Sequence, residues 1–424
     1  MPRLPQWLKA DKTAALADSA LRSVLRVAAA VTVARMTDAH GFASFVTLTT
    51  IETIGTALAG AAISNPLITL LPARGKVATG AILAVARRWS WAAAAVFGGG
   101  GWALAWGVLG TSAIEATAFS AFVGASTLST AHRARLTAGF RSQRVLAADA
   151  AGASLAAVAI AGLAAGSTLT GNECVWIALA AGAVLSAWML RWSAGSFGHV
   201  ADDANDDAAA ADMKRLAVPM VIGSAGVTVS SRLQPFALEA AAGAAAVAVF
   251  GAAQSLAGPL RLMSMSLSGL VRPRLALHLA KGNLPAANRT LLLSMAPPVL
   301  LSLLSIPVIL LAGRQIQQAM FGAGIPYSAA CLLGLFVYAA LEAIGANLTI
   351  AVQTFDVNGS RRATVTRLIA AAAALALLWP SAWLAGAAGS AWSLAVVEAL
   401  FAITLYAGFR RAAAQAAQRQ TPGV

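Results

Sequence analysis

The sequence predicts an all-α integral membrane protein whose twelve transmembrane helices form two six-helix bundles, related by a pseudo-two-fold axis along the membrane normal. The first observation behind this prediction is composition. Of the 424 residues, 59% are hydrophobic and only 11% are charged, and the mean hydropathy is +0.74. The second is length, because twelve spans with short loops need about 35 residues each. The third is the placement of basic residues, described below.

The same composition excludes several classes of protein. A soluble domain carries about 25% charged residues, so this chain cannot cover its surface with charge. Two cysteines, Cys174 and Cys331, are too few to staple a disulfide scaffold of this length. The chain has no ATP-binding motif, no metal-ligand spacing among its histidines and no set of nucleophile, base and acid. We therefore predict no enzyme, no catalytic residues, no metal and no cofactor.

Apolar stretches long enough to cross a bilayer recur along the whole chain. Most tryptophans fall near the ends of these stretches, which is typical of an interfacial belt. The predicted spans are 16–35, 42–64, 84–109, 112–131, 148–169, 173–192, 216–238, 245–270, 289–311, 327–353, 364–385 and 389–409.

Basic residues alternate between the two sides of this partition. With the N-terminus inside, 27 of the 30 Lys and Arg residues fall on the inner half, and only Arg35, Arg232 and Arg314 fall on the outer half. A shift by one helix would destroy this alternation, so we expect a multi-pass protein with both termini cytoplasmic. The net charge of +14 is thereby assigned to cytoplasmic loops, and no nucleic-acid partner is predicted.

The chain divides near its middle. Residues 195–215 are its longest polar stretch and carry five aspartates, so we predict an N-terminal bundle over 1–194, an acidic cytoplasmic linker over 195–215, and a C-terminal bundle with a cytoplasmic tail over 216–424. The halves also look like parallel repeats, because Arg35 ends the first span after Val31-Thr32-Val33 and the seventh span contains Arg232 shortly after Val227-Thr228-Val229.

Two junctions carry a resemblance to a known family. The run from Ala34-Arg35 to Gly41-Phe42-Ala43-Ser44-Phe45, and Ser231-Arg232 followed by 247–253, resemble the junctions between the first two helices of each half in Wzx-type polysaccharide exporters. These exporters belong to the multidrug/oligosaccharidyl-lipid/polysaccharide superfamily. The second junction departs from the family pattern, since Ser231 stands at an acidic position and Phe250 replaces the usual tyrosine.

The resemblance implies a flippase of the inner, or cytoplasmic, membrane. Such a protein moves a polyprenyl-pyrophosphate-linked oligosaccharide from the inner to the outer leaflet by alternating access, for exopolysaccharide or O-antigen assembly. The implied partners are this substrate, membrane lipids and a polysaccharide polymerase complex. Because the sequence has no ATP-binding motif, we expect the energy to come from an H⁺ or Na⁺ gradient, from the substrate gradient, or from both. An anionic head can cross the hydrocarbon only if its charge is paired, so we expect a hydrated basic cavity.

Four arginines are the candidate ligands of the pyrophosphate. A guanidinium stays charged when buried and offers forked donors to phosphate oxygens. Arg35 and Arg232 occupy matched positions in the two halves, and the alternative is that each snorkels to the interface. Arg22 and Arg26 lie four residues apart on one helix face, where they could also serve only as cytoplasmic anchors. Asp18 is placed to pair with Arg22.

Three glutamates inside apolar stretches, Glu52, Glu342 and Glu398, are candidates for ion coupling or gating. The alternative is a static ion pair or a satisfied contact between helices. Asp149 and Glu115 lie near span ends, where we expect interfacial positions. Four polar residues are candidates for the glycan path, although such residues also hold helices together. They are Asn65, Gln254, Asn347 and Gln353.

Three other functions are also compatible with the sequence. A drug or metabolite exporter of the same superfamily is the first alternative, and it would favour an acidic or aromatic pocket. A membrane-embedded glycan polymerase or ligase is the second, although the short outer loops offer few catalytic residue types. A non-transporting scaffold of a polysaccharide assembly complex is the third.

Overall fold

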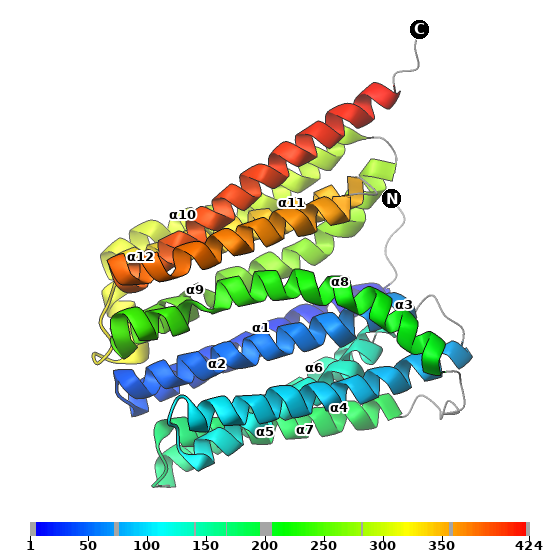
Figure 1. Ribbon diagram of the computed structural model, residues 1–424. Coiled ribbons are helices and arrows are strands. Elements are labelled where there is room, and N and C mark those ends of the chain that lie inside the picture. The colour runs from blue at the N-terminus through cyan, green and yellow to red at the C-terminus, as the bar shows by residue number, and fades with distance from the viewer. Residues whose placement is uncertain are drawn as a thin grey trace. The chain divides into compact units, whose positions relative to one another are not determined.

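The computed structural model describes residues 6–71, 76–139, 141–166, 168–195, 206–280, 283–355 and 359–420. Within these ranges the side chains of some positions, chiefly 261–277 and 412–420, lie outside the description. All regular structure in the described ranges is helical (Figure 1). The helices are α1 (Gln6–Met36), α2 (Ala39–Ala59), α3 (Asn65–Leu70), α4 (Lys76–Gly107), α5 (Ala113–Ala138), α6 (Ser142–Gly166), α7 (Gly171–Gly195), α8 (Asp206–Arg232), α9 (Gln234–Ala280), α10 (Leu284–Phe321), α11 (Ala329–Phe355) and α12 (Gly359–Gln420).

The predicted all-α class with twelve membrane-crossing segments in two bundles is confirmed for the described part of the chain. A π-helical turn at Gly60–Ser64 joins α2 to α3 in one continuous span. Helix α12 supplies two spans, because its backbone reverses at Ala385 (φ −141°) and Gly386 (φ 54°). The left-handed φ at Gly386 is a conformation that glycine adopts without strain.

Two compact units make up the chain, Met1–Thr228 and Val229–Val424. The division falls inside α8, which begins at Asp206 within the predicted linker. The predicted span 216–238 is wrong as a single helix, because α8 ends at Arg232 and a new helix begins at Gln234. Gly243, with φ 78° and ψ 176°, then bends α9 before its long second part.

Seven segments of the described chain are long and apolar enough to cross a membrane on these two measures alone. One of them, Arg361–Arg411, contains both arms of α12. Helix α10 contributes Pro285–Phe321, within which an 18-residue stretch has a mean hydropathy of 2.2 and is only 17% buried. A helix so apolar with such an exposed surface is suited to contact with lipid.

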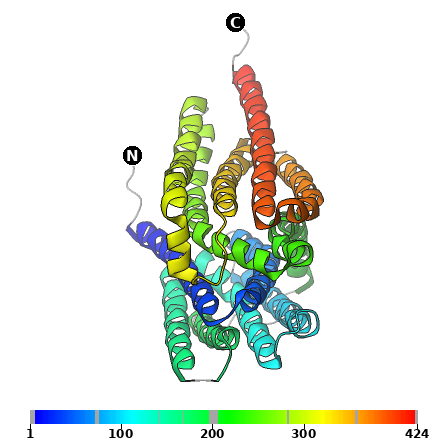
Figure 2. The same cartoon turned by 90° about the vertical axis from the view of Figure 1, so that its left-hand side faces the viewer.

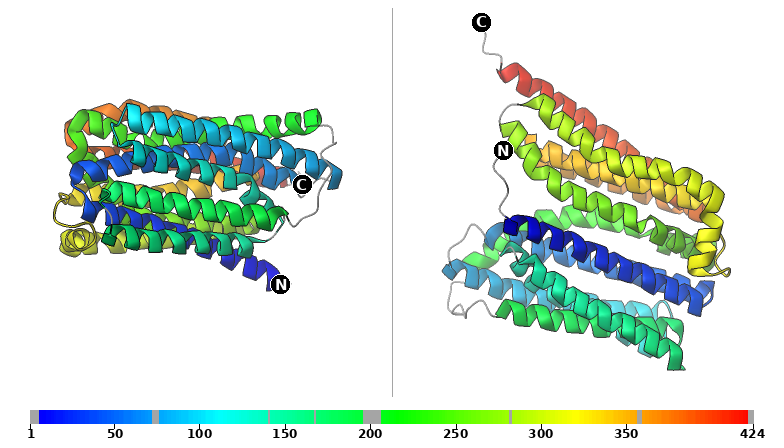
Figure 3. Two further views of the ribbon diagram at one scale, coloured as in Figure 1. Left: turned by 90° about the horizontal axis from the view of Figure 1, so that it is seen from below. Right: turned by 180° about the vertical axis from the view of Figure 1, so that it is seen from behind.

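A pair of glycines permits a close helix contact in the first unit. Helices α6 and α7 lie side by side (Figure 3), and a Cβ at Gly152 would meet the Gly182 carbonyl oxygen at 2.5 Å. The same holds in reverse for a Cβ at Gly182. Small residues permit such backbone approach, which supplies packing where lipid gives no hydrophobic drive.

Aromatic packing fixes another part of the first unit. Trp176 is fully buried, and its ring centroid lies 5.1 Å from that of Phe45 on α2 and 4.9 Å from that of Phe119 on α5. Trp176 is therefore a core residue that holds three helices together, and it does not belong to the expected interfacial belt.

The second unit is organised around the hairpin of α12. Helix α12, orange to red in Figure 2, packs against α11 and α9. Phe401 and Phe409 of the second arm are buried together with Ala363 of the first arm and Leu348 of α11. This core brings polar residues of both arms into contact, as described below.

The glycine contact between α6 and α7 leads to a prediction. We expect Gly152→Ala to destabilise the protein by about 1–3 kcal/mol, because the added methyl group overpacks the contact. Thermal unfolding in detergent measures the effect. Gly162→Ala, on the same helix, is the matched control, since a Cβ at Gly162 meets nothing within 4 Å. Equal stability of the two variants would contradict the assigned helix contact.

Candidate functional site

Helix α1 carries three of the four predicted arginines. Arg22 and Arg26 lie one turn apart on one face, whereas Arg35 lies about 180° around the helix from Arg26 at about 100° per residue. All three are exposed. The structure thus brings Arg22 and Arg26 together and does not bring Arg35 to them.

Arg26 forms an ion pair with Glu52 of α2. Its Nη2 donates to both carboxylate oxygens, at 3.0 Å and 2.9 Å. The Glu52 side chain is 5% exposed, whereas that of Arg26 is 58% exposed. A buried carboxylate therefore anchors an exposed cation. The Nε–H and Nη1 groups of Arg26 make no hydrogen bond within the described part of the chain and remain as donors.

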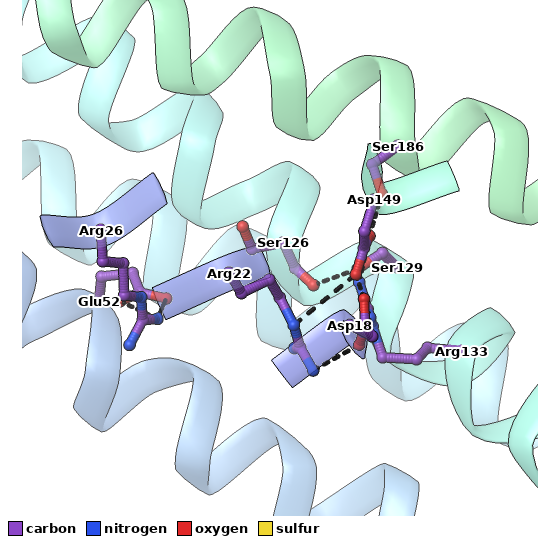
Figure 4. Close-up of polar contacts among 9 residues, drawn as sticks. All are labelled: Asp18, Arg22, Arg26, Glu52, Ser126, Ser129, Arg133, Asp149 and Ser186. Atoms are coloured by element: carbon purple, nitrogen blue, oxygen red, sulfur yellow. Dashed lines mark hydrogen bonds and ion pairs between the residues drawn. The ribbon is translucent and has the colours of Figure 1, made fainter. Parts of the chain in front are cut away.

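A second cluster, which we call the four-charge network, consists of Asp18, Arg22, Arg133 and Asp149 (Figure 4). Arg133 of α5 donates to the two carboxylate oxygens of Asp149 on α6, at 2.5 Å and 2.8 Å. Arg22 donates to Asp18 at 2.7 Å, as the sequence predicts. Ser186 of α7 donates to Asp149 at 2.6 Å.

The four-charge network balances its charges, with two carboxylates and two guanidinium groups. Asp18 and Asp149 are each 6% exposed at the side chain and Arg133 is 22% exposed, whereas Arg22 is 50% exposed. A charge removed from water needs a partner and hydrogen bonds to offset its desolvation. Arg133 supplies both inside the bundle, while Arg22 closes the network at the surface.

The described part of the second unit contains a comparable pair. Arg367 on the first arm of α12 donates to both oxygens of Glu398 on the second arm, at 2.7 Å and 2.9 Å. The guanidinium carbon also lies 3.8 Å from the centre of the Phe401 ring, in cation–π contact. On α11, a Cβ at Gly345 would lie 2.6 Å from a Glu398 oxygen, so glycine leaves room for the carboxylate.

The remaining predicted site residues lie apart from these clusters. Arg232, half-exposed, is the last residue of α8, and Glu342 is half-exposed on α11. For the glycan path, Asn65 is exposed at the start of α3, Gln254 is half-buried and Asn347 is fully buried. The side chain of Gln353 lies outside the description.

Sequence reasoning missed three members of these clusters. The sequence predicts Arg133 and Arg367 only as cytoplasmic charges and Asp149 only as an acid near a span end, whereas Asp149 is buried between helices, as is Glu115. The signal for Asp149 is an acid on a helix otherwise made almost entirely of small apolar residues. Among the described residues, no group of three or more His, Cys, Asp or Glu could hold a metal ion.

Solved structures share this architecture over nearly the whole chain. An inward-facing MATE family multidrug resistance transporter of the MOP superfamily superposes with a TM-score of 0.75 at 13% identity, over 94% of this chain and 96% of that one. The chain has the fold of MOP superfamily transporters. The outward-facing structure of such a transporter gives a TM-score of 0.68 at 13% identity, over 96% of this chain and 95% of that one.

A third similar structure is a MOP superfamily transporter from Pyrococcus furiosus, described as having a binding pocket of reverse polarity that suggests a different function. It gives a TM-score of 0.62 at 13% identity, over 96% of this chain and 95% of that one. No protein-family model matches the sequence, and no curated protein matches it. The likeness to solved structures therefore establishes the fold.

The four-charge network contains one largely enclosed arginine, Arg133, and one half-exposed arginine, Arg22. We expect Arg133→Gln to destabilise the protein by about 3–5 kcal/mol, because it leaves Asp149 buried without its main partner. Arg22→Gln should cost at most about 1 kcal/mol, because half of that side chain is already in contact with the surroundings. Thermal unfolding of both variants in detergent tests this difference, and an equal loss would contradict the assignment.

Proposed function

We propose that the protein is a flippase that carries a polyprenyl-pyrophosphate-linked oligosaccharide from the inner to the outer leaflet by alternating access. The observation that supports this proposal best is the ion pair of Arg26 and Glu52. A cation is held in a membrane-spanning helix by a buried carboxylate, while more than half of its side chain stays exposed. An anionic head that crosses the hydrocarbon needs such a counter-charge.

The geometry of α1 suits a diphosphate. Residues four apart on a helix have Cβ atoms about 5–6 Å apart, so Arg22 and Arg26 can each face one phosphoryl group. The free Nε–H and Nη1 donors of Arg26 would bind phosphate oxygens. The incoming phosphate then competes with Glu52 for Arg26, and binding becomes an exchange of one anionic partner for another.

The shared fold supports transport as the general function. Its relatives include inward-facing and outward-facing transporter structures, which is consistent with alternating access here. We place the protein in the cytoplasmic membrane with both termini inside. We further propose Arg35 and Arg232 as additional phosphate ligands, and Asn65, Gln254, Asn347 and Gln353 as contacts along the glycan path.

Coupling is assigned to carboxylates within the spans. Glu52 is released when phosphate takes its place beside Arg26, and a released buried carboxylate can accept a proton or Na⁺. Glu398 is held by Arg367 in the same manner, and we place it, with Glu342, in coupling or gating. A polysaccharide polymerase complex would consume the product on the outer side.

An exporter of drugs or metabolites is the second candidate function. Multidrug resistance transporters of this fold favour it, as does the buried carboxylate Glu52, which could attract a cationic compound. The two functions differ in the sign of the substrate charge. An exporter of cations would keep its activity, or gain some, when Arg26 is neutralised.

Reconstituted vesicles test the flippase proposal directly. We expect Arg26→Gln to lower the rate of translocation of a fluorescent polyprenyl-pyrophosphate oligosaccharide at least tenfold, because one phosphate loses its counter-charge. Arg26→Lys should retain part of the rate, since it keeps the charge without the fork.

Arg314→Gln is the matched control for this experiment, as an exposed arginine on α10 outside the proposed site. Unchanged translocation by Arg26→Gln would contradict the phosphate role. Efflux of a cationic dye by the wild-type protein, undiminished in Arg26→Gln, would favour the exporter.

A further inference from the structure

A groove of about 770 Å³ lies within the second unit, between the end of α11 and the two arms of α12. Arg361 and Arg362 line it from the first arm, and Arg411 lines it from the second. The walls between them are mainly apolar, with Val365 and Ile403, and also include Thr366 and Thr404. None of the described lining residues is acidic, so the groove combines a basic mouth with aliphatic sides.

The position of the groove favours a ligand from the membrane. The three arginines belong to the end of the unit that the charge distribution assigns to the cytoplasmic side. Val365 and Ile403 are exposed there, so the apolar walls open to the surroundings of the helices. The inner leaflet supplies anionic phospholipids, to which each basic residue near the surface adds attraction.

The groove is separate from the ion pair below it. Arg367 lies deeper on the same arm and is already held by Glu398 at 2.7 Å. Beneath the groove, Leu405 and Val352 are buried in the core of the unit and form a rigid floor. A free phosphate ion would use the guanidinium groups but leave the aliphatic walls in water, whereas a phospholipid satisfies both.

We propose that this groove binds the headgroup phosphate of an anionic phospholipid of the inner leaflet, with the start of an acyl chain along Val365 and Ile403. The groove is distinct from the substrate site proposed above, since Arg22 and Arg26 of α1 are not among the residues that line it. The bound lipid would brace the two arms of α12 at their cytoplasmic ends.

The experiment uses the full-length protein in detergent with added lipid, observed by native mass spectrometry. Phosphatidylglycerol should be retained at least tenfold better than phosphatidylcholine. Arg361→Gln and Arg411→Gln should each weaken its retention about fivefold, the loss expected for one basic residue at a membrane surface. Arg410→Gln is the matched control, because it removes an exposed neighbouring charge that does not line the groove.

Several results would overturn the proposal. They are equal retention of the two lipids, an equal loss in Arg410→Gln, binding of inorganic phosphate as tight as that of phosphatidylglycerol, or full displacement of phosphatidylglycerol by equimolar polyprenyl pyrophosphate. Unchanged thermal unfolding in phosphatidylcholine alone shows that a variant is folded. Because Arg361 and Arg411 lie on different arms, either folded variant suffices for the test.

Discussion

The pairing of guanidinium groups with buried carboxylates is the constraint on which the rest of this structure depends. The helices are rich in Ala, Gly and Leu and tolerate few charges, so a buried carboxylate that stays ionised needs a partner within the bundle. Asp149 meets Arg133, Glu52 meets Arg26, and Glu398 meets Arg367. These pairs tie α1 to α2, α5 to α6, and the two arms of α12.

The pairs differ in the exposure of the arginine, and this exposure decides which guanidinium group an anion outside the bundle can reach. Arg133 and Arg367 are largely enclosed, so their carboxylates have no competitor from outside. Arg26 faces outward while Glu52 behind it stays enclosed. Of the pairs described, it is the one whose cation is most open to a second anion. Arginine and a carboxylate can therefore form either a fixed ion pair or a pair in which a ligand anion replaces the carboxylate.

The sequence predicts the parts of this arrangement that depend on local spacing. Hydropathy gives the helices, and the pair of Asp18 and Arg22 follows from a separation of four residues. The predicted spans 364–385 and 389–409 anticipate the reversal at Ala385 and Gly386, but they do not show that Arg367 of one arm meets Glu398 of the other, because that contact depends on how the two arms pack. The spacing of nine residues places Arg35 on the opposite side of the helix from Arg26, provided that both residues belong to one continuous helix.

The exchange of Glu52 for phosphate is the central claim, and the affinity of Glu52→Gln for a polyprenyl pyrophosphate in nanodiscs tests it most directly. The variant should bind several-fold more tightly than the wild-type protein, because the competing carboxylate is gone while Arg26 is retained. In the background of Arg26→Gln the same change should have no effect. Weaker or unchanged binding by Glu52→Gln alone would show that Arg26 does not pass from the carboxylate to the phosphate.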